Sequence, residues 1–596
     1  MYSQTPVFKI DEYGPVEPKS PGQNFNKIME SSDCMKSKSV IFSLYFLIFI
    51  LILGSCIPKK EPTPLAVTPL PTITPTIYDP MPAGDNRYPW WNRIVFYEIF
   101  VRSFYDSDGD GIGDFKGLTE KLDYLNDGDP NTKTDLGING IWLMPIFLSP
   151  SYHGYDVIDY RTINPDYGTM QDFQIFLEEA HQRGIRVIID FVINHTSTEN
   201  PWFEDARSDL NSPYRDWYIW SEEKLTYLGP WDQNVWHFNF DNQYYYGIFW
   251  SGMPDLNYKN PYVTEEILET ADYWLTDVGV DGFRVDGARH LIEDGKVQEN
   301  TAETHDWFKK FYTFYKEKKP LALSVGEVWD SNFAAVQYVK NEEFDLVFDF
   351  ELSESILEGI NGRNAKKIMN ALEFNTGLYP DYQKANFLTN HDMNRVMNVF
   401  QENDQKAKIA ATILFTAPGV PFVYYGEEVG MRGSKPDEDI RRPMQWTAGD
   451  QAGFTDGIAW RNLNNNSDNW NVETLASQED SIFNLYRSLI HLRNEESALQ
   501  IGKFQLVEAN NTNIVAYYRF TTDQVFLVVI NLSEEIQEIE IEISKSVFKD
   551  GQYKWVNVLN TEELGSISVV SDTKNIVTLN IILKPEAFIV TQFVAE

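Results

Sequence analysis

Gly282-Phe283-Arg284-Val285-Asp286 is the stretch that decides the fold, because a strand-forming run leads directly into a carboxylate. Val325–Trp329 and Phe387–Asp392 repeat this pattern with Glu327 and Asp392. Parallel strands that end at one rim would bring these three acids together. Cleavage of a glycosidic bond needs one carboxyl group that keeps its proton and one that is ionised. The three segments therefore predict a parallel sheet with a catalytic rim.

Short apolar runs alternate with amphipathic segments after Tyr88, and this alternation indicates βα units. The candidate strands are residues 95–100, 140–144, 187–191, 282–285, 322–325, 346–350, 385–388 and 420–424. Eight such units predict an α/β fold, the closed (β/α)8 or TIM barrel. A helix over residues 481–494 would complete the barrel.

Two further regions differ from this alternation. Residues of about 195–262, after the third strand, are rich in Trp, Tyr, Asn and Asp and too long for a plain connection, so we predict an inserted domain there. From residue 501 the runs alternate between apolar and polar residues, which predicts a C-terminal antiparallel β-sandwich over 501–596. The catalytic barrel would then span residues 84–500.

The N-terminal region has the composition of a signal rather than of a folded domain. Basic residues precede an apolar stretch, and Leu53-Gly54-Ser55-Cys56 resembles the lipobox of bacterial lipoproteins. We therefore predict a lipoprotein signal peptide over 35–56 with lipidation at Cys56, preceded by an upstream extension over 1–34. A transmembrane anchor over residues 40–57 is the alternative.

Residues 57–83 are rich in Pro and Thr, which predicts an extended linker. It would hold the barrel away from the membrane. We expect the protein to be extracytoplasmic, lipid-anchored to the bacterial cell membrane and monomeric.

The composition limits the class of partner. A formal net charge of −38 gives no electrostatic footprint for nucleic acid, so a neutral substrate is expected. The 14% of aromatic residues would suffice for stacking on sugar rings. The two cysteines, Cys34 and Cys56, precede the predicted folded region, which excludes a disulfide framework.

Six segments together resemble the signatures of the α-amylase superfamily, glycoside hydrolase family 13, and the likeness covers roughly residues 90–596. Besides the three opening segments, they are residues 190–195, 253–257 and 419–428. The resemblance implies a retaining reaction in which Asp286 is the nucleophile, Glu327 the general acid/base and Asp392 the transition-state stabiliser. Arg284 lies on the same side of its strand as Asp286 and would keep that carboxylate ionised.

The resemblance also implies substrate-binding residues. His195 and His391 would hydrogen-bond the sugar next to the cleaved bond, and Tyr155 would form the aromatic platform under it. Arg289 and His290 resemble the pair that contacts the leaving-group sugars. Arg284 completes the predicted binding set.

Residues 106–114 place carboxylates at alternate positions with glycines between them, as in a chelating loop for a hard cation such as calcium. The loop resembles the Ca²⁺ site after the first strand in several family members. The expected ligands are Asp106, Asp108, Asp110, the carbonyl of Ile112, and Asp114. A second calcium site that uses Asn194 is left open.

The substrate prediction rests on two further resemblances. Residues 253–257, Met-Pro-Asp-Leu-Asn, resemble a group intermediate between oligo-1,6-glucosidases and neopullulanases. Exo-acting α-glucosidases place an Asp where this chain has Tyr152, so the departure favours an open cleft. We expect an α-amylase that cleaves internal α-1,4 bonds of starch, glycogen or maltodextrins. Neopullulanase, cyclomaltodextrinase and α-glucosidase activities remain alternatives.

Two hypotheses without catalysis are also open. Amino-acid transporter heavy chains combine a membrane anchor with this barrel, but they lack the full acid set that this chain keeps. A membrane-tethered protein could instead bind maltodextrins and deliver them to a transporter. Loss of hydrolysis on substitution of Glu327 would separate an enzyme from both.

Overall fold

The computed structural model describes residues 84–85, 87–544, 546–570 and 577–596. The predicted extension (1–34), the signal peptide (35–56) with Cys56, the alternative membrane anchor and the linker (57–83) lie outside the described residues. Within the described ranges, no helix combines the length and the apolar character needed to cross a membrane.

Eight parallel strands form one sheet in the order β11-β10-β9-β5-β2-β1-β13-β12. They are β1 (Phe96–Ile99), β2 (Gly140–Leu143), β5 (Arg186–Phe191), β9 (Gly282–Val285), β10 (Leu323–Gly326), β11 (Leu346–Val347), β12 (Ala385–Asn386) and β13 (Val420–Tyr424). A parallel bridge between Phe348 and Ala385 joins the two ends of this order. The predicted (β/α)8 barrel is confirmed, with each strand inside or within one residue of its predicted run.

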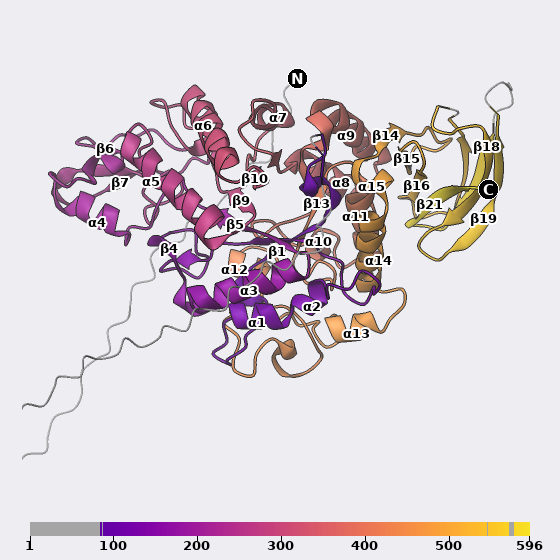
Figure 1. Cartoon of the computed structure of the whole chain (residues 1–596), viewed down its shortest axis with the longest axis horizontal. Coiled ribbons are helices and arrows are strands. Elements are labelled where there is room, and N and C mark those ends of the chain that lie inside the picture. The colour runs from indigo at the N-terminus through magenta and orange to yellow at the C-terminus, as the bar shows by residue number, and fades with distance from the viewer. Residues whose placement is uncertain (1–83, 86, 545, 571–576) are drawn as a thin grey trace, which may run out of the picture. The chain divides into compact units, whose positions relative to one another are not determined.

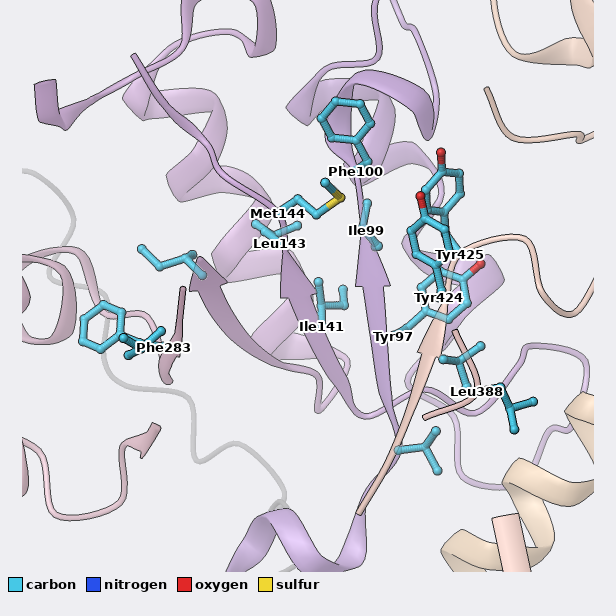
Figure 2. Close-up of a cluster of buried hydrophobic side chains, with 14 of the residues drawn as sticks. Tyr97, Ile99, Phe100, Ile141, Leu143, Met144, Phe283, Leu388, Tyr424 and Tyr425 are labelled. Carbon is cyan, nitrogen blue, oxygen red and sulfur yellow. The ribbon is translucent and has the colours of Figure 1, made fainter. Parts of the chain in front are cut away.

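Alternate residues of the barrel strands face opposite sides of the sheet, as the pleat requires. One set forms a separate hydrophobic cluster in which Phe96 of β1 stacks on Phe422 of β13 at 4.4 Å between ring centroids. The other set belongs to the larger cluster shared with the helices; Figure 2 shows Tyr97, Ile141 and Phe283 from three of its strands.

Amphipathic helices follow the strands and bury their apolar residues. In α3 (Met170–Gln182), for example, Phe173, Phe176, Leu177 and Ala180 are buried, and Thr169 caps the helix start. The other helices of the barrel region are α1 (Phe115–Glu120), α2 (Leu122–Leu125), α5 (Pro261–Asp272), α6 (Ala302–Lys318), α7 (Asn332–Lys340), α8 (Phe350–Asn361), α9 (Ala365–Leu378), α10 (Val396–Val399), α11 (Asp404–Thr416), α12 (Asp437–Ile440), α13 (Val472–Ala476), α14 (Ile482–Glu495) and α15 (Ser497–Ile501). The predicted helix over 481–494 is α14.

Two excursions leave the barrel on the side of the predicted site. After β2, the hairpin of β3 (Phe147–Leu148) and β4 (Asp159–Ile163) encloses a loop with Tyr152 and Tyr155. Between β5 and α5, the chain forms α4 (Pro201–Ser208) and a three-stranded sheet of β6 (Trp220–Ser221), β8 (Tyr244–Tyr246) and β7 (Trp236–Phe238). This sheet has a small hydrophobic cluster of its own, with Val235 and Ile248 fully or almost fully buried.

The C-terminal region is antiparallel, as predicted. A six-stranded sheet has the order β14-β15-β16-β21-β18-β19, and β17 pairs with β20 in a second sheet. The strands are β14 (Lys503–Leu506), β15 (Ile514–Phe520), β16 (Val525–Asn531), β17 (Gln537–Glu542), β18 (Gly551–Asn557), β19 (Glu562–Val569), β20 (Thr578–Leu583) and β21 (Ala587–Ala595). Residues of both sheets share one buried cluster, so they form a sandwich. In Figure 1 these strands, drawn in yellow, lie beside α9 and α15, which contact β15.

Candidate active site

A single buried guanidinium connects three carboxylates at the carboxyl end of the barrel. Arg284 Nη1 donates to Asp286 Oδ1 at 2.7 Å and to Asp190 Oδ1 at 2.8 Å, and Nη2 lies 2.8 Å from Glu327 Oε2. The Arg284 side chain is only 1% exposed, whereas those of Asp286 and Glu327 are each 12% exposed. The predicted contact between Arg284 and Asp286 is therefore present, and the same arginine also reaches Glu327.

The strand order explains this meeting. β9 lies between β5 and β10 in the sheet, so the residues that end these three strands are neighbours. Arg284 and Asp286 are two residues apart and share one side of β9. The backbone N–H of Gly287 then donates to Glu327 Oε2 at 2.9 Å and ties the β9 end to the β10 end.

Glu327 lies in an environment that favours the protonated carboxyl group. Burial raises its pKa above the ordinary range; the positive charge of Arg284 opposes the rise, and the negative charges of Asp286 and Asp392 add to it. Burial is thus the first cause of the shift in the pKa of Glu327.

Asp392 has the opposite environment. Burial alone would raise its pKa, but the charges of His391 and Arg441 hold it well below the ordinary range. Arg441 Nη2 donates to Asp392 Oδ1 at 2.7 Å, and His391 Nε2 lies 3.1 Å from Asp392 Oδ2. Asp392 is consequently ionised at neutral pH, next to a carboxyl group that tends to keep its proton.

Tyr155 lies against His391, with ring centroids 5.5 Å apart and the planes inclined by 16°. Its hydroxyl is 2.6 Å from His391 Nε2 and donates to Asp190 Oδ2 at 3.1 Å. The tyrosine ring is therefore fixed between two strand ends, in the position of a rigid platform.

His195 contacts the backbone of this tyrosine. Its Nε2 lies 3.0 Å from the carbonyl oxygen of Tyr155, and the side chain is buried. Burial lowers its pKa to about 4, so the imidazole is neutral at physiological pH and its Nε2–H can donate to this carbonyl.

The predicted pair Arg289 and His290 lies next to the β9 end but is more constrained than expected. Arg289 Nη1 is 3.3 Å from Glu299 and 3.4 Å from Asp330. His290 is only 3% exposed, and its Nδ1 is 2.9 Å from the carbonyl of Gln298. The His290 ring thus has little surface left for a ligand.

Three of the predicted calcium ligands come together. Single carboxylate oxygens of Asp106, Asp108 and Asp114 all lie within 4.8 Å of one another. Asp110 is not part of this group, and its Oδ1 accepts from the backbone N–H of Ile112 at 2.8 Å. An all-oxygen donor set of this kind suits Ca²⁺.

The sequence reasoning missed three residues of the site: Asp190, Glu98 and Arg441. Asp190 is fully buried, and burial raises its pKa to about 7 against the charge of Arg284. Glu98, inside β1, faces His391 Nδ1. Asp190 and Glu98 could have been found from the sequence, because each is a charged residue inside an apolar strand, β5 and β1. Arg441 follows α12 in an irregular segment, where no such pattern marks it.

A (β/α)8 barrel that gathers three carboxylates around one arginine at its carboxyl rim, with an ionised aspartate beside them, defines a class of carboxylate-dependent glycoside hydrolases. A family model described as "Alpha amylase, catalytic domain" matches residues 98–502. Alpha-amylase 3 of Dictyoglomus thermophilum is 41% identical over 454 residues, 76% of this chain and 86% of the relative. An oligo-1,6-glucosidase of Parageobacillus thermoglucosidasius is 31% identical over 75% of this chain and 91% of the relative.

A solved structure, that of the alpha-amylase from H. orenii, is 43% identical to the chain with a TM-score of 0.73, and the match covers 84% of this chain and 99% of that one. The chain therefore belongs to the alpha-amylase family of glycoside hydrolases, family 13.

Proposed function

We propose that the chain is an endo-acting α-amylase that hydrolyses internal α-1,4-glucosidic bonds with retention of configuration. The observation that carries this proposal is the pair of carboxyl groups on Arg284: Asp286 and Glu327 contact the same guanidinium at 2.7 and 2.8 Å. A retaining reaction needs a nucleophile and an acid/base with a separation of about 5–5.5 Å between their carboxyl groups.

The charges assign the steps. Glu327 gives its proton to the leaving oxygen while an Asp286 oxygen attacks C1 of the sugar, so the glycosidic bond breaks and a glycosyl ester forms. Glu327 then takes a proton from water, whose oxygen attacks C1 and releases Asp286. Asp392, held ionised by Arg441 and His391, stabilises the positive charge that develops on the sugar in both steps.

Two features favour cleavage within a chain. Tyr152, where exo-acting relatives would place an Asp, stacks on Trp460 with centroids 5.5 Å apart and inclined by 26°. Its ring also lies 5.9 Å from the guanidinium carbon of Arg441, which binds Asp392. An aromatic pair beside the acids offers a surface for a further sugar, where a carboxylate would grip a chain end. The similarity to two proteins named as α-amylases supports the same reading.

An exo-acting α-glucosidase is the second candidate, and the likeness to an oligo-1,6-glucosidase favours it. The Met253–Asn257 segment resembles the intermediate group of the family and is compatible with both activities. The two candidates differ in the size and linkage of the substrate.

The test uses the full-length chain with soluble starch, maltose and isomaltose, beside its Glu327→Gln variant. Fast release of reducing ends from starch, with both disaccharides intact, is expected for the endo-amylase. Preferential cleavage of either disaccharide would favour the α-glucosidase. If no substrate is cleaved, or if the variant keeps the full rate, the proposed mechanism is wrong.

We further propose that the cluster of Asp106, Asp108 and Asp114 holds Ca²⁺, and that Cys56 carries a lipid. The carboxylate geometry supports the first proposal, and the signal-like sequence before Cys56 supports the second. Metabolic labelling with a radioactive fatty acid should mark the chain in a bacterial host and should fail in the Cys56→Ser variant.

A further inference from the structure

The inserted region between β5 and α5 places two aromatic rings against the β9 end of the site. The Phe249 ring lies so close to Gly287 that a Cβ there would be 2.9 Å from Phe249 Cζ. Trp231 stacks on Phe249 with centroids 5.8 Å apart and the planes inclined by 28°. Since Gly287 follows Asp286 and binds Glu327, this aromatic pair begins directly at the two proposed catalytic acids.

The same pair covers His290. The Trp231 ring is 5.2 Å from the His290 ring and that of Phe249 is 6.0 Å from it, both at steep angles. His290 is 3% exposed, whereas Trp231 is 42% exposed. A ligand on this side of the site can therefore reach the Trp231 ring, while the buried His290 ring packs against that tryptophan.

Trp231 is held in place although it lies in a short turn. Its backbone N–H donates to Gln233 Oε1 at 2.8 Å, and Gln233 Nε2 donates to the carbonyl of Ile248 at 2.7 Å. A bridge between Leu228 and Asn234 closes the turn. A fixed, half-exposed indole costs little conformational entropy when a ring stacks on it.

We propose that Trp231, supported by Phe249, is the stacking platform for the sugars of the leaving group and for acceptor sugars in transfer reactions. The proposal rests on the function proposed above. Glu327 protonates the leaving oxygen, so the departing sugar lies on the Glu327 side of the cleaved bond. On this side, contacts run from Glu327 through Gly287 and Phe249 to Trp231. Tyr155 and His391 instead contact Asp190 and Asp392, on the other side of the cleaved bond.

The Trp231→Ala variant tests whether Trp231 acts on the leaving group or on catalysis as a whole. The test compares two substrates that differ in the leaving group. Maltopentaose has sugars there, and α-maltosyl fluoride has a single fluorine atom. We expect kcat/KM for maltopentaose to fall about tenfold, the upper range for loss of one stacked ring. Cleavage of the fluoride should stay within about twofold of the wild type, since a contact confined to the leaving group contributes nothing there.

Transfer gives a second readout that does not depend on the fraction of active protein. With α-maltosyl fluoride as donor, an Asp286 oxygen attacks C1, the C1–F bond breaks, fluoride leaves with the proton of Glu327, and the maltosyl ester of Asp286 forms. Either water or the O4 hydroxyl of added maltose then attacks C1, and Glu327 takes the proton. Trp231→Ala should lower the ratio of tetrasaccharide to maltose formed from the donor, and Trp231→Phe should retain most of it.

Phe238→Ala is the matched control, because Phe238 is 62% exposed in the same inserted region and pairs with Tyr244. It should change neither substrate preference nor transfer. Equal loss on maltopentaose and on the fluoride, or no loss on either, would overturn the role of Trp231. Failure of the wild type to cleave both substrates would instead refute the proposed function, and the inference with it.

Discussion

His391 is a buried histidine that lies between two carboxylates of the site. Its Nδ1 faces Glu98 of β1, and its Nε2 lies 3.1 Å from Asp392. Burial alone would lower its pKa, but the two carboxylates raise it from 6.5 to about 10. Both ring nitrogens are therefore protonated at neutral pH, and the imidazolium links the first strand of the barrel to a proposed catalytic acid.

This shift predicts how the stability of the protein depends on pH. Because the folded pKa of His391 lies above its unfolded value, its contribution is complete below pH 6.5 and is lost as the pH rises towards 10, on the order of 5 kcal/mol in total. In Glu98→Gln one of the two carboxylates is missing, so the decrease of Tm between pH 6.5 and 10 should be smaller. Calorimetry at several pH values measures it, with the exposed Glu303→Gln as control. Parallel Tm curves for the wild type and Glu98→Gln would contradict the assignment.

At the scale of elements, the C-terminal end of α11 is capped by arginines from two distant segments. Arg493 of α14 donates to the carbonyls of Phe415 at 2.8 Å and Gly419 at 2.5 Å, and Arg519 of β15 donates to that of Thr416 at 2.6 Å. Both side chains are fully buried. Cations at a helix C-terminus satisfy its free carbonyls and favour its dipole. This cap also joins the barrel to the C-terminal sheets.

Removal of the Arg493 guanidinium should therefore destabilise α11 as well as α14, which carries the arginine. Arg493→Met leaves buried carbonyls without a donor, which should cost about 3 kcal/mol. The matched control is Arg487→Met on the same helix, where a partly exposed arginine makes one hydrogen bond, at 3.2 Å to the Thr134 carbonyl, and lies over the Phe483 ring, and about 0.5 kcal/mol is expected. Chemical unfolding measures both. Equal destabilisation by the two substitutions would mean that the cap adds no stability.

For the whole molecule, the sequence predicted the order and type of the elements better than the contacts that complete the site. The eight strands were predictable because each is a short apolar run, and Asp286 and Glu327 because each follows such a run directly. Arg441 reaches Asp392 across 49 residues from an irregular segment, so no local pattern marks it. The burial of His290 was equally unpredictable. The rings that cover it, Trp231 and Phe249, belong to the inserted region, which lies about 40 to 60 residues earlier in the sequence.

The proposed calcium site lies in a loop that is hydrogen-bonded to a distant segment of the chain. The loop after β1 binds a segment after β13: Asp106 Oδ2 accepts from the Thr455 hydroxyl at 2.5 Å, and the Gly111 carbonyl accepts from the N–H of Trp460 at 2.9 Å. Trp460 in turn stacks on Tyr152 beside the acids. Loss of the ion would leave the negative charges of the loop unbalanced and loosen this connection.

Chelation with EDTA should therefore lower Tm by a few degrees and change the tryptophan fluorescence, and added Ca²⁺ should restore both. Asp108→Asn removes one ligand charge without removing a buried group, since Asp108 is exposed, and it should weaken the response to Ca²⁺. Asp129→Asn, in another exposed acidic turn, should respond as the wild type does. A Tm that EDTA leaves unchanged would show that the loop is held by its hydrogen bonds alone, since Asp106 already accepts from three backbone N–H groups and the Thr455 hydroxyl.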